Sequence, residues 1–185
     1  MTKIAVLFAE GFEEMEALAP VDLLKRAEFD VKMIGLEENV TGAHGITVQM
    51  DKQLTDYLLD YDAIVIPGGQ PGASNLRKNE TVIQSLKRHY ASGKKVASIC
   101  AGPTVLDEAG ILSEKEFISF PGTEDEIKSG QRQADAITVT DGNVLTARGA
   151  GAAYEFSLAL IDWLGGDAEA IRESIQYKHV IESYQ

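Results

Sequence analysis

Runs of apolar residues alternate with amphipathic segments along the chain. The continuous run KIAVLFA predicts a strand over 3–9 that is buried on both faces, as in a parallel sheet. Comparable runs predict further strands over 29–36, 45–50, 62–69 and 94–100. We expect the strand over 45–50 to lie at a sheet edge. Two β runs around Asp141-Gly142-Asn143 predict a hairpin over 136–148, because these residues favour tight turns.

Segments with helical spacing lie between the strands. The segment 14–27 carries an apolar stripe at intervals of three, formed by Met15, Leu18, Val21, Leu24 and Ala27. Asn79 is the expected N-cap of a helix over 79–92. Further helices are predicted over 102–110, 151–166 and 167–175, and a short one over 53–59.

This alternation predicts one α/β domain over 1–185, with a mostly parallel sheet and helices on both faces. Ligands of such folds bind beyond the carboxyl ends of the strands. Four loops occupy that position, and each is rich in glycine, acids or cysteine: 9–16, 67–73, 100–104 and 148–153.

Composition excludes several classes of function. Of the 185 residues, 44% are apolar and 25% are charged, which is an ordinary globular balance. The net charge of −12 disfavours nucleic acid and anionic membranes as partners, because both require a basic surface. No apolar run approaches the length of a membrane span.

The expected location is the cytoplasm. The first apolar run is short and ends in acids, unlike a signal peptide. The single cysteine can form neither an intramolecular disulfide nor a thiolate cluster. The histidines lack metal-ligand spacing, so we expect no metal. We expect His89 to lie on a solvated helix face, and His44 either to face a cleft or to be an ordinary loop residue.

Cys100 lies between a predicted strand and a predicted helix. One interpretation is a small buried hydrophobe, as free cysteine often is. The other is a nucleophile, since the free N–H groups and dipole of a helix start favour thiolate. The tight turn would then strain its backbone, as in serine nucleophile elbows. These residues alone leave both interpretations open.

Two further segments could serve a reactive cysteine. Gly68 and Gly69 end a strand, where backbone N–H groups can approach a ligand oxygen or simply form a turn. Glu16 lies on a helix with a buried face, and a poorly solvated carboxyl group keeps its proton. The chain has no phosphate-binding P-loop sequence, and GAGAAY (149–154) lacks the third glycine of a dinucleotide fingerprint, so no cofactor is expected.

Several segments together resemble the ThiJ/PfpI family, in its parkinsonism-associated, deglycase-like branch. The matching segments span nearly the whole chain: EGFEEME…PVDLLKRA (10–27), DAIVIPGG…GA.NL (62–76), ASICAGPTVL (97–106), LTARGAG…EF (145–156) and the terminal helix. The resemblance implies a flavodoxin-like three-layer sandwich, a homodimer, and a reactive cysteine on a nucleophile elbow.

The resemblance also implies roles for individual residues. Cys100 matches the nucleophile, and Glu16 matches the acid that hydrogen-bonds its sulfur. Backbone donors of an oxyanion pocket fall at Gly68, Gly69 and Ala101. The loop that lines the site contains Arg148 and Gly149.

Three positions depart from relatives. Phe120 stands where human-like members carry histidine, so a Cys-His pair from that segment is absent. His44 stands where relatives tend to carry arginine, and could be a polar group at the rim of the site. Ala101 follows the cysteine directly, where the family's proteases have histidine, so peptidase activity is not expected.

The leading hypothesis is a cofactor-independent enzyme, glyoxalase- or deglycase-like, acting on reactive 2-oxoaldehydes through Cys100 and Glu16. Its partner would be a small carbonyl compound. The alternative is a cysteine-based sensor of oxidative stress or a protective, chaperone-like protein. A third interpretation is a folded carrier with a relic site.

Overall fold

The computed structural model describes residues 1–183. In this range the main sheet has seven strands, in the order β10-β11-β7-β6-β1-β2-β5. Their bounds are β1 (Lys3–Phe8), β2 (Asp30–Gly35), β5 (Lys52–Gln53), β6 (Ala63–Ile66), β7 (Lys95–Ile99), β10 (Thr138–Asp141) and β11 (Val144–Ala147). All neighbouring strands are parallel except β10 and β11, which form the predicted hairpin.

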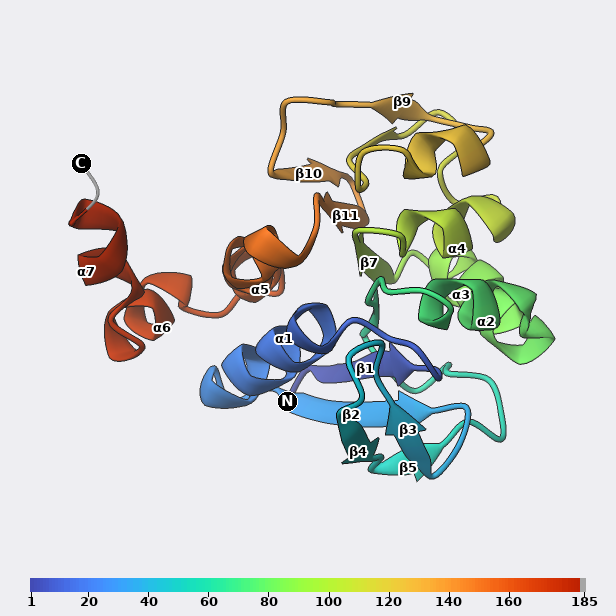
Figure 1. Ribbon diagram of the computed structural model, residues 1–185, viewed down its shortest axis with the longest axis horizontal. Helices are drawn as coiled ribbons and strands as arrows, with labels where there is room; N and C mark the ends of the chain where they lie inside the picture. The colour runs from blue at the N-terminus through green and yellow to red at the C-terminus, as the bar shows by residue number, and fades with distance from the viewer. Residues whose placement is uncertain (184–185) are drawn as a thin grey trace.

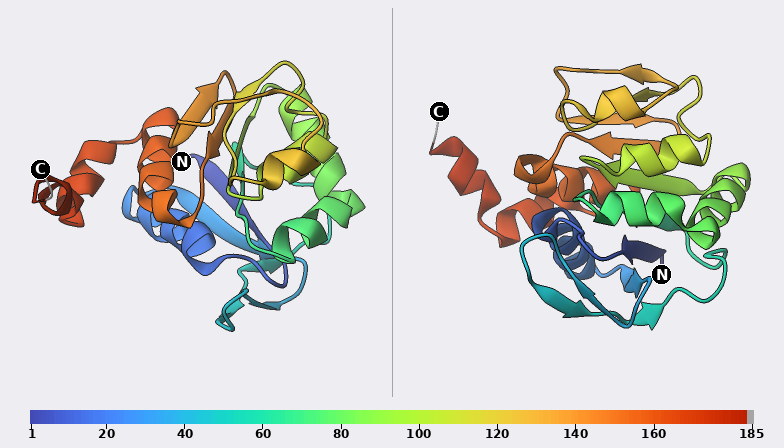
Figure 2. Two further views of the ribbon diagram at one scale, coloured as in Figure 1. Left: turned by 45° about the horizontal axis from the view of Figure 1, so that its top comes forward. Right: turned by 45° about the vertical axis from the view of Figure 1, so that its right-hand side comes forward.

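Helices cover both faces of this sheet (Figures 1 and 2). One face packs against α1 (Glu14–Arg26), α5 (Ala153–Trp163) and α6 (Ala168–Ser174); the other packs against α2 (Gly72–Lys78), α3 (Glu80–Ala91) and α4 (Pro103–Glu108). Both faces of the sheet are apolar because successive side chains of a strand point to opposite faces: Ile4 and Val6 of β1 belong to the core on one face, and Ala5 and Leu7 to the core on the other. The predicted three-layer architecture is confirmed.

Shorter elements decorate the edges. Two small sheets pair β3 (Asn39–Thr41) with β4 (Thr47–Gln49), and β8 (Glu116–Phe117) with β9 (Gln131–Arg132). The remaining elements are the 3-10 turns η1 (Thr123–Glu126) and η2 (Ala150–Ala152), and α7 (Tyr177–Glu182). Helix α7 follows α6, and the two helices extend beyond α5, away from the sheet (Figure 1). No helix within the described range has the length and apolar character to cross a membrane.

Two predicted elements are wrong in type or place. Residues 53–59 form no helix: the Asp56 side chain accepts the Tyr57 N–H at 2.7 Å, a local bond that competes with helical pairing. The strand predicted over 45–50 is β4, which pairs with β3 outside the main sheet. Alternation along one strand does not identify its partner.

The buried face of α1 also differs from the predicted stripe. Met15 is 57% exposed, whereas Glu16 is fully buried. Val21 and Leu24 join the core, and Leu18 and Ala27 pack against it. The predicted stripe therefore fails only at Met15, and the acid Glu16 lies on the buried face as expected.

His89 is buried as well, contrary to the expectation of a solvated position. It follows Val82 and Leu86 at helical spacing on the face of α3 that packs against the sheet. Its Nε2 lies 3.0 Å from the carbonyl oxygen of Lys95.

Candidate active site

Cys100 lies in the sharp turn between β7 and α4. Its φ is +64°, a left-handed conformation that is rare and strained for a residue other than glycine. Its N–H donates to Ala147 O, and its carbonyl accepts the Phe120 N–H, both at 3.0 Å. A Cβ at Gly102 would lie 2.6 Å from Ile66 O, so the turn needs glycine there. Strand, strained residue and helix together form the predicted nucleophile elbow.

Glu16 is the buried acid of the site. Its Oε2 accepts the Gly68 N–H at 2.9 Å, while its Oε1 is buried without a standard hydrogen-bond partner among the described residues. Burial raises the pKa of Glu16 to about 7, and the nearby charge of Glu13 adds to the increase. Interaction with the Cys100 side chain lowers that pKa, as does the Gly68 amide. Glu16 can therefore exchange a proton near neutral pH.

Gly68 lies where the acid and the cysteine converge. A Cβ at this position would lie 2.5 Å from Glu16 Oε2 and 2.7 Å from Cys100 Cβ. Only glycine leaves room for both side chains. Because its N–H is bonded to Glu16, Gly68 is not free to stabilise an oxyanion, contrary to the role that the resemblance implied.

The structure changes the reason for expecting a reactive thiol. Burial raises the pKa of Cys100, and the carboxylate of Glu16 raises it further. Backbone hydrogen bonds from Ala101 and Gly69 lower the pKa but do not outweigh these effects. The backbone amides at the helix start therefore favour the thiolate, but burial and the Glu16 carboxylate oppose it more strongly. Interaction between the two side chains shifts the pKa of each group, so the titrations of Glu16 and Cys100 are coupled.

The backbone N–H groups of Gly69 and Ala101 are the donors directed at the sulfur. Gly69 has a φ of +88°, and a Cβ there would lie 2.3 Å from Glu13 N. The loop can therefore approach α1 closely enough to place its amides at the cysteine. Two such donors can stabilise negative charge on sulfur or on an oxygen attached to the adjacent carbon.

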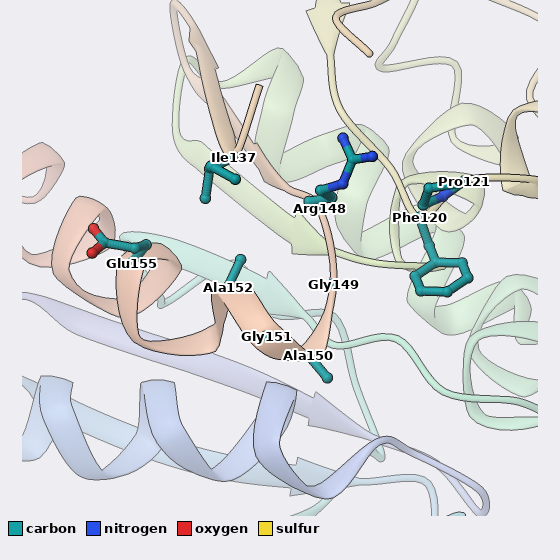
Figure 3. Close-up of a pocket in the computed structure, with 9 residues that line it drawn as sticks. All are labelled: Phe120, Pro121, Ile137, Arg148, Gly149, Ala150, Gly151, Ala152 and Glu155. Atoms are coloured by element: carbon teal, nitrogen blue, oxygen red, sulfur yellow. The ribbon is translucent and has the colours of Figure 1, made fainter. Parts of the chain in front are cut away.

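A cavity of about 390 Å³ opens beside the start of α5 (Figure 3). It is lined by Phe120, Pro121, Ile137, Arg148, Gly149, Ala150, Gly151, Ala152 and Glu155. Three residues expected near the site thus lie in one wall: Phe120, Arg148 and Gly149. Sequence reasoning missed Ile137, an exposed apolar residue in a loop, for which no local pattern exists.

His44 belongs to a polar cluster at the start of α1. Its Nδ1 lies 2.7 Å from Glu14 Oε2, and its N–H donates to Glu14 Oε1 at 2.7 Å. This carboxylate raises the pKa of His44. Ligand atoms of Glu13, Glu14 and His44 lie within 4.8 Å of one another, which is close enough for a metal ion. Glu14 and His44 already satisfy each other, and Glu13 accepts the Glu16 N–H at 2.8 Å. Sequence spacing did not reveal this cluster, because the residues come from separate loops.

The fold and the elbow define a class, namely α/β proteins with a flavodoxin-like sheet and a cysteine at the strand-to-helix turn. The model of the DJ-1/PfpI family matches residues 2–163. The chain belongs to this family, as the sequence resemblance predicted.

Named relatives agree with this assignment. The chain is 36% identical over 167 residues to the Parkinson disease protein 7 homolog of Danio rerio, covering 87% of this chain and 88% of the relative. It is 36% identical over 155 residues to a deglycase of Pyrococcus abyssi, covering 82% and 93%.

Solved structures confirm the flavodoxin-like fold. Drosophila melanogaster DJ-1beta superposes with a TM-score of 0.88 at 30% identity, covering 95% of this chain and 97% of that one. The oxidised form of Toxoplasma gondii DJ-1 gives a TM-score of 0.86 at 33% identity, covering 95% and 98%.

Proposed function

We propose that this protein is a cofactor-independent enzyme that converts reactive 2-oxoaldehydes to 2-hydroxy acids at Cys100. The observation that carries the proposal is the buried Glu16 carboxyl, whose pKa of about 7 places a proton donor and acceptor beside a thiol on a strained elbow. Relatives named as deglycases support chemistry on carbonyl adducts.

The chemistry begins with proton transfer from the Cys100 thiol to the Glu16 carboxylate. The thiolate attacks the aldehyde carbon and forms a C–S bond, while the electron pair of the C=O bond moves to oxygen. The N–H groups of Gly69 and Ala101 stabilise this oxyanion, which then takes the proton from Glu16 and gives a neutral hemithioacetal.

Glu16 then moves a proton between the two carbons. Its carboxylate removes the proton from the former aldehyde carbon while the ketone oxygen is protonated, which gives an enediol. The proton then returns to the adjacent carbon and the hydroxyl proton of the former hemithioacetal is released, replacing the proton taken up by the ketone oxygen, so the ketone becomes an alcohol and the hemithioacetal becomes a thioester. Water cleaves the C–S bond, releases the hydroxy acid and restores the thiol. One carbon is oxidised and its neighbour is reduced, so no external oxidant or cofactor is consumed.

The test is methylglyoxal turnover by Cys100→Ser and Glu16→Gln. We expect Cys100→Ser to abolish formation of lactate, and Glu16→Gln to lower kcat/KM about 10²- to 10⁴-fold, the usual contribution of a general acid–base group. Circular dichroism of each variant controls for folding. Full turnover by Cys100→Ser would refute the proposal.

A second candidate function is redox sensing, because the amides of Gly69 and Ala101 can stabilise an oxidised cysteine as well as an oxyanion. The oxidised Toxoplasma gondii relative supports this alternative. Attack of the thiolate on peroxide gives a sulfenate and water, and a second equivalent gives a sulfinate. Intact mass after mild peroxide treatment should then increase by two oxygens in the wild type and not in Cys100→Ser.

We also propose that the protein acts as a homodimer in the cytoplasm. Support for the dimer comes from two exposed apolar side chains on adjoining segments: Met15 (57%) at the start of α1, and Ile46 (52%) in the β3–β4 turn that His44 joins to Glu14. Burying such residues between copies is favourable. The proposed location rests on the sequence features given above.

A further inference from the structure

The cavity beside the start of α5 has a volume of about 390 Å³, within the usual range for a small-molecule site (Figure 3). Backbone bonds fix its walls: the Arg148 N–H donates to Ile137 O at 3.0 Å, and the Ala152 N–H donates to Gly149 O at 2.7 Å. A Cβ at Gly149 would lie 3.0 Å from the Phe120 ring, so the close approach of these two residues depends on the glycine.

Most of the cavity wall is apolar. Phe120 and Ile137 are each 49% exposed, a large fraction for such side chains, and they line the cavity together with Pro121, Ala150 and Ala152. An apolar group seated between them would remove this surface from water, which is favourable. A cavity of about 150 Å³ is sufficient to bind benzene, so this one has room for a phenyl ring and a polar substituent.

Arg148 supplies a positive charge to the same cavity. Its Nη1 donates to Ala134 O, and its guanidinium forms no ion pair with any acid of residues 1–183. Glu124 is the acid whose pKa it helps to lower, but that carboxylate lies 3.5 Å from Arg132. The remaining N–H groups of Arg148 are exposed to solvent. They can therefore donate the paired hydrogen bonds that a carboxylate accepts from arginine.

The start of α5 adds backbone donors to the cavity. The N–H groups of Ala150 and Gly151, which line the cavity in the turn leading into α5, have no hydrogen-bond partner among residues 1–183. No side chain caps η2 or α5. Free N–H groups in such a position favour an anion. Arg148 and this turn are separate features, and both favour a negatively charged ligand group.

Glu155 is the single acid that lines the cavity within the described range. Its carboxylate lies 3.9 Å from Arg172 and hydrogen-bonds Tyr177, and Figure 3 shows it directed away from Ala152. It therefore does not neutralise Arg148. The net charge of −12 on the chain disfavours anions in general, so the apolar wall must contribute to affinity. This combination favours an anion with a hydrocarbon body over inorganic phosphate.

We propose that this cavity binds small monocarboxylates with an apolar body, namely aromatic or branched aliphatic acids. Phe120 and Ile137 contact the hydrocarbon body, while Arg148 and the free N–H groups of the η2 turn bind the carboxylate. The site is separate from the chemistry proposed for Cys100, because binding uses neither its thiol nor Glu16.

Isothermal titration calorimetry with benzoate and with benzyl alcohol, its neutral analogue of similar size, tests the recognition of charge. We expect the wild type to bind benzoate at least about tenfold more tightly, and Arg148→Gln to remove this difference. The matched control is Arg26→Gln, since Arg26 pairs with Asp22 in the last turn of α1. The control should keep the difference. Equal affinities of the wild type for the two compounds, or no binding of benzoate, overturn the proposal.

A second variant tests the apolar wall. Ile137→Ser places a hydroxyl in it, and we expect the affinities for benzoate and benzyl alcohol each to fall about tenfold. The matched control is Leu59→Ser, since Leu59 is 45% exposed and its carbonyl accepts a bond from Lys94, at the opposite end of β7 from Cys100. Circular dichroism checks that each variant is folded. Unchanged affinity for benzoate in Ile137→Ser overturns the proposal, as does equally tight binding of inorganic phosphate to the wild type.

Cys100→Ser separates this site from the proposed function. We expect it to bind benzoate as the wild type does, whether or not the wild type turns over methylglyoxal. Loss of benzoate binding in Cys100→Ser would place the ligand at the thiol and overturn the proposal. If benzoate binds only to Ile46→Glu, which carries a charge on the proposed dimer surface, a second copy covers the cavity and the proposal is likewise overturned.

Discussion

The pairing of Glu16 with Cys100 sets the chemistry at the residue scale. Each group is costly to charge in its buried position, and each affects the pKa of the other. The sequence identified both residues, and it also indicated a poorly solvated acid. It did not indicate that Gly68 holds the acid in place through its N–H.

The first prediction concerns the stability cost of Glu16. Its pKa is about 7 in the folded state against an ordinary value of 4.5, so between these pH values the folded state binds a proton that the unfolded state has released. Proton binding by Glu16 therefore contributes its full share to the free energy of unfolding below about pH 4.5, and this contribution is lost as the pH rises through about 7. We therefore expect Glu16→Gln to be more stable than the wild type by up to about 3 kcal/mol at about pH 8.

Urea unfolding at about pH 4 and about pH 8 measures this difference. The two proteins should have similar free energies of unfolding at the lower pH, where both side chains are neutral. Glu182→Gln is a control, because it removes one carboxylate at an exposed position of α7 and leaves Glu16 and its neighbours unchanged. Equal stabilities of Glu16→Gln and wild type at the higher pH would contradict the prediction.

At the scale of elements, α3 shows that a helix with basic residues in its last turn can still pack one face against the core. Asn79 caps it as predicted, accepting the Val82 N–H at 3.1 Å. The basic residues near its end suggested a solvated face, yet His89 lies on the apolar stripe and is fully buried. Helical spacing from Val82 and Leu86 was the signal that could have placed it.

The second prediction follows from this burial. Desolvation lowers the pKa of His89, so the folded state keeps the imidazole neutral while the unfolded state binds a proton below about 6.5. Stability from this residue is therefore lost as pH falls through 6.5, with a slope of at most about 1.4 kcal/mol per pH unit. We expect His89→Gln to flatten the pH dependence of the urea midpoint between about pH 5 and pH 7.

The control is His179, a histidine at an exposed position of α7. His179→Gln should leave the pH dependence as in the wild type. A variant His89→Gln with an unaltered acid slope would show that the imidazole is not the group responsible.

At the scale of the whole molecule, the parallel sheet brings distant loops together. Four residues of the site follow the carboxyl ends of neighbouring parallel strands, which lie at the same end of the sheet. They are Glu16 after β1, Gly68 after β6, Cys100 after β7 and Gly149 after β11. The same end carries the exposed apolar residues Met15 and Ile46. A second copy that bound there would cover Met15 and Ile46 and would leave the opposite end of the sheet exposed.

The third prediction is the assembly state. Sedimentation should give twice the chain mass of 20.0 kDa for the wild type. Ile46→Glu should lower the sedimenting mass towards that of the monomer, because a two-fold interface buries the new charge of both copies. Leu59→Glu adds the same charge at the other end of the molecule and should remain dimeric. A wild-type protein that sediments as a monomer would refute the dimer.

The amino-acid sequence by itself determined the central strands and the main helices, the hairpin at Asp141, the strand-to-helix position of Cys100 and the family. These features depend on local spacing, because the periodicity of a strand or helix is visible in the order of apolar and polar residues within one short segment. Tertiary structure alone decided that Met15 faces solvent, that β4 pairs outside the main sheet, and that Phe120 and Ile137 line one cavity. Each of these depends on contacts between residues far apart in the chain, such as the bond from Gly68 to Glu16 across 52 positions. Only the folded sheet brings those residues within reach of one another.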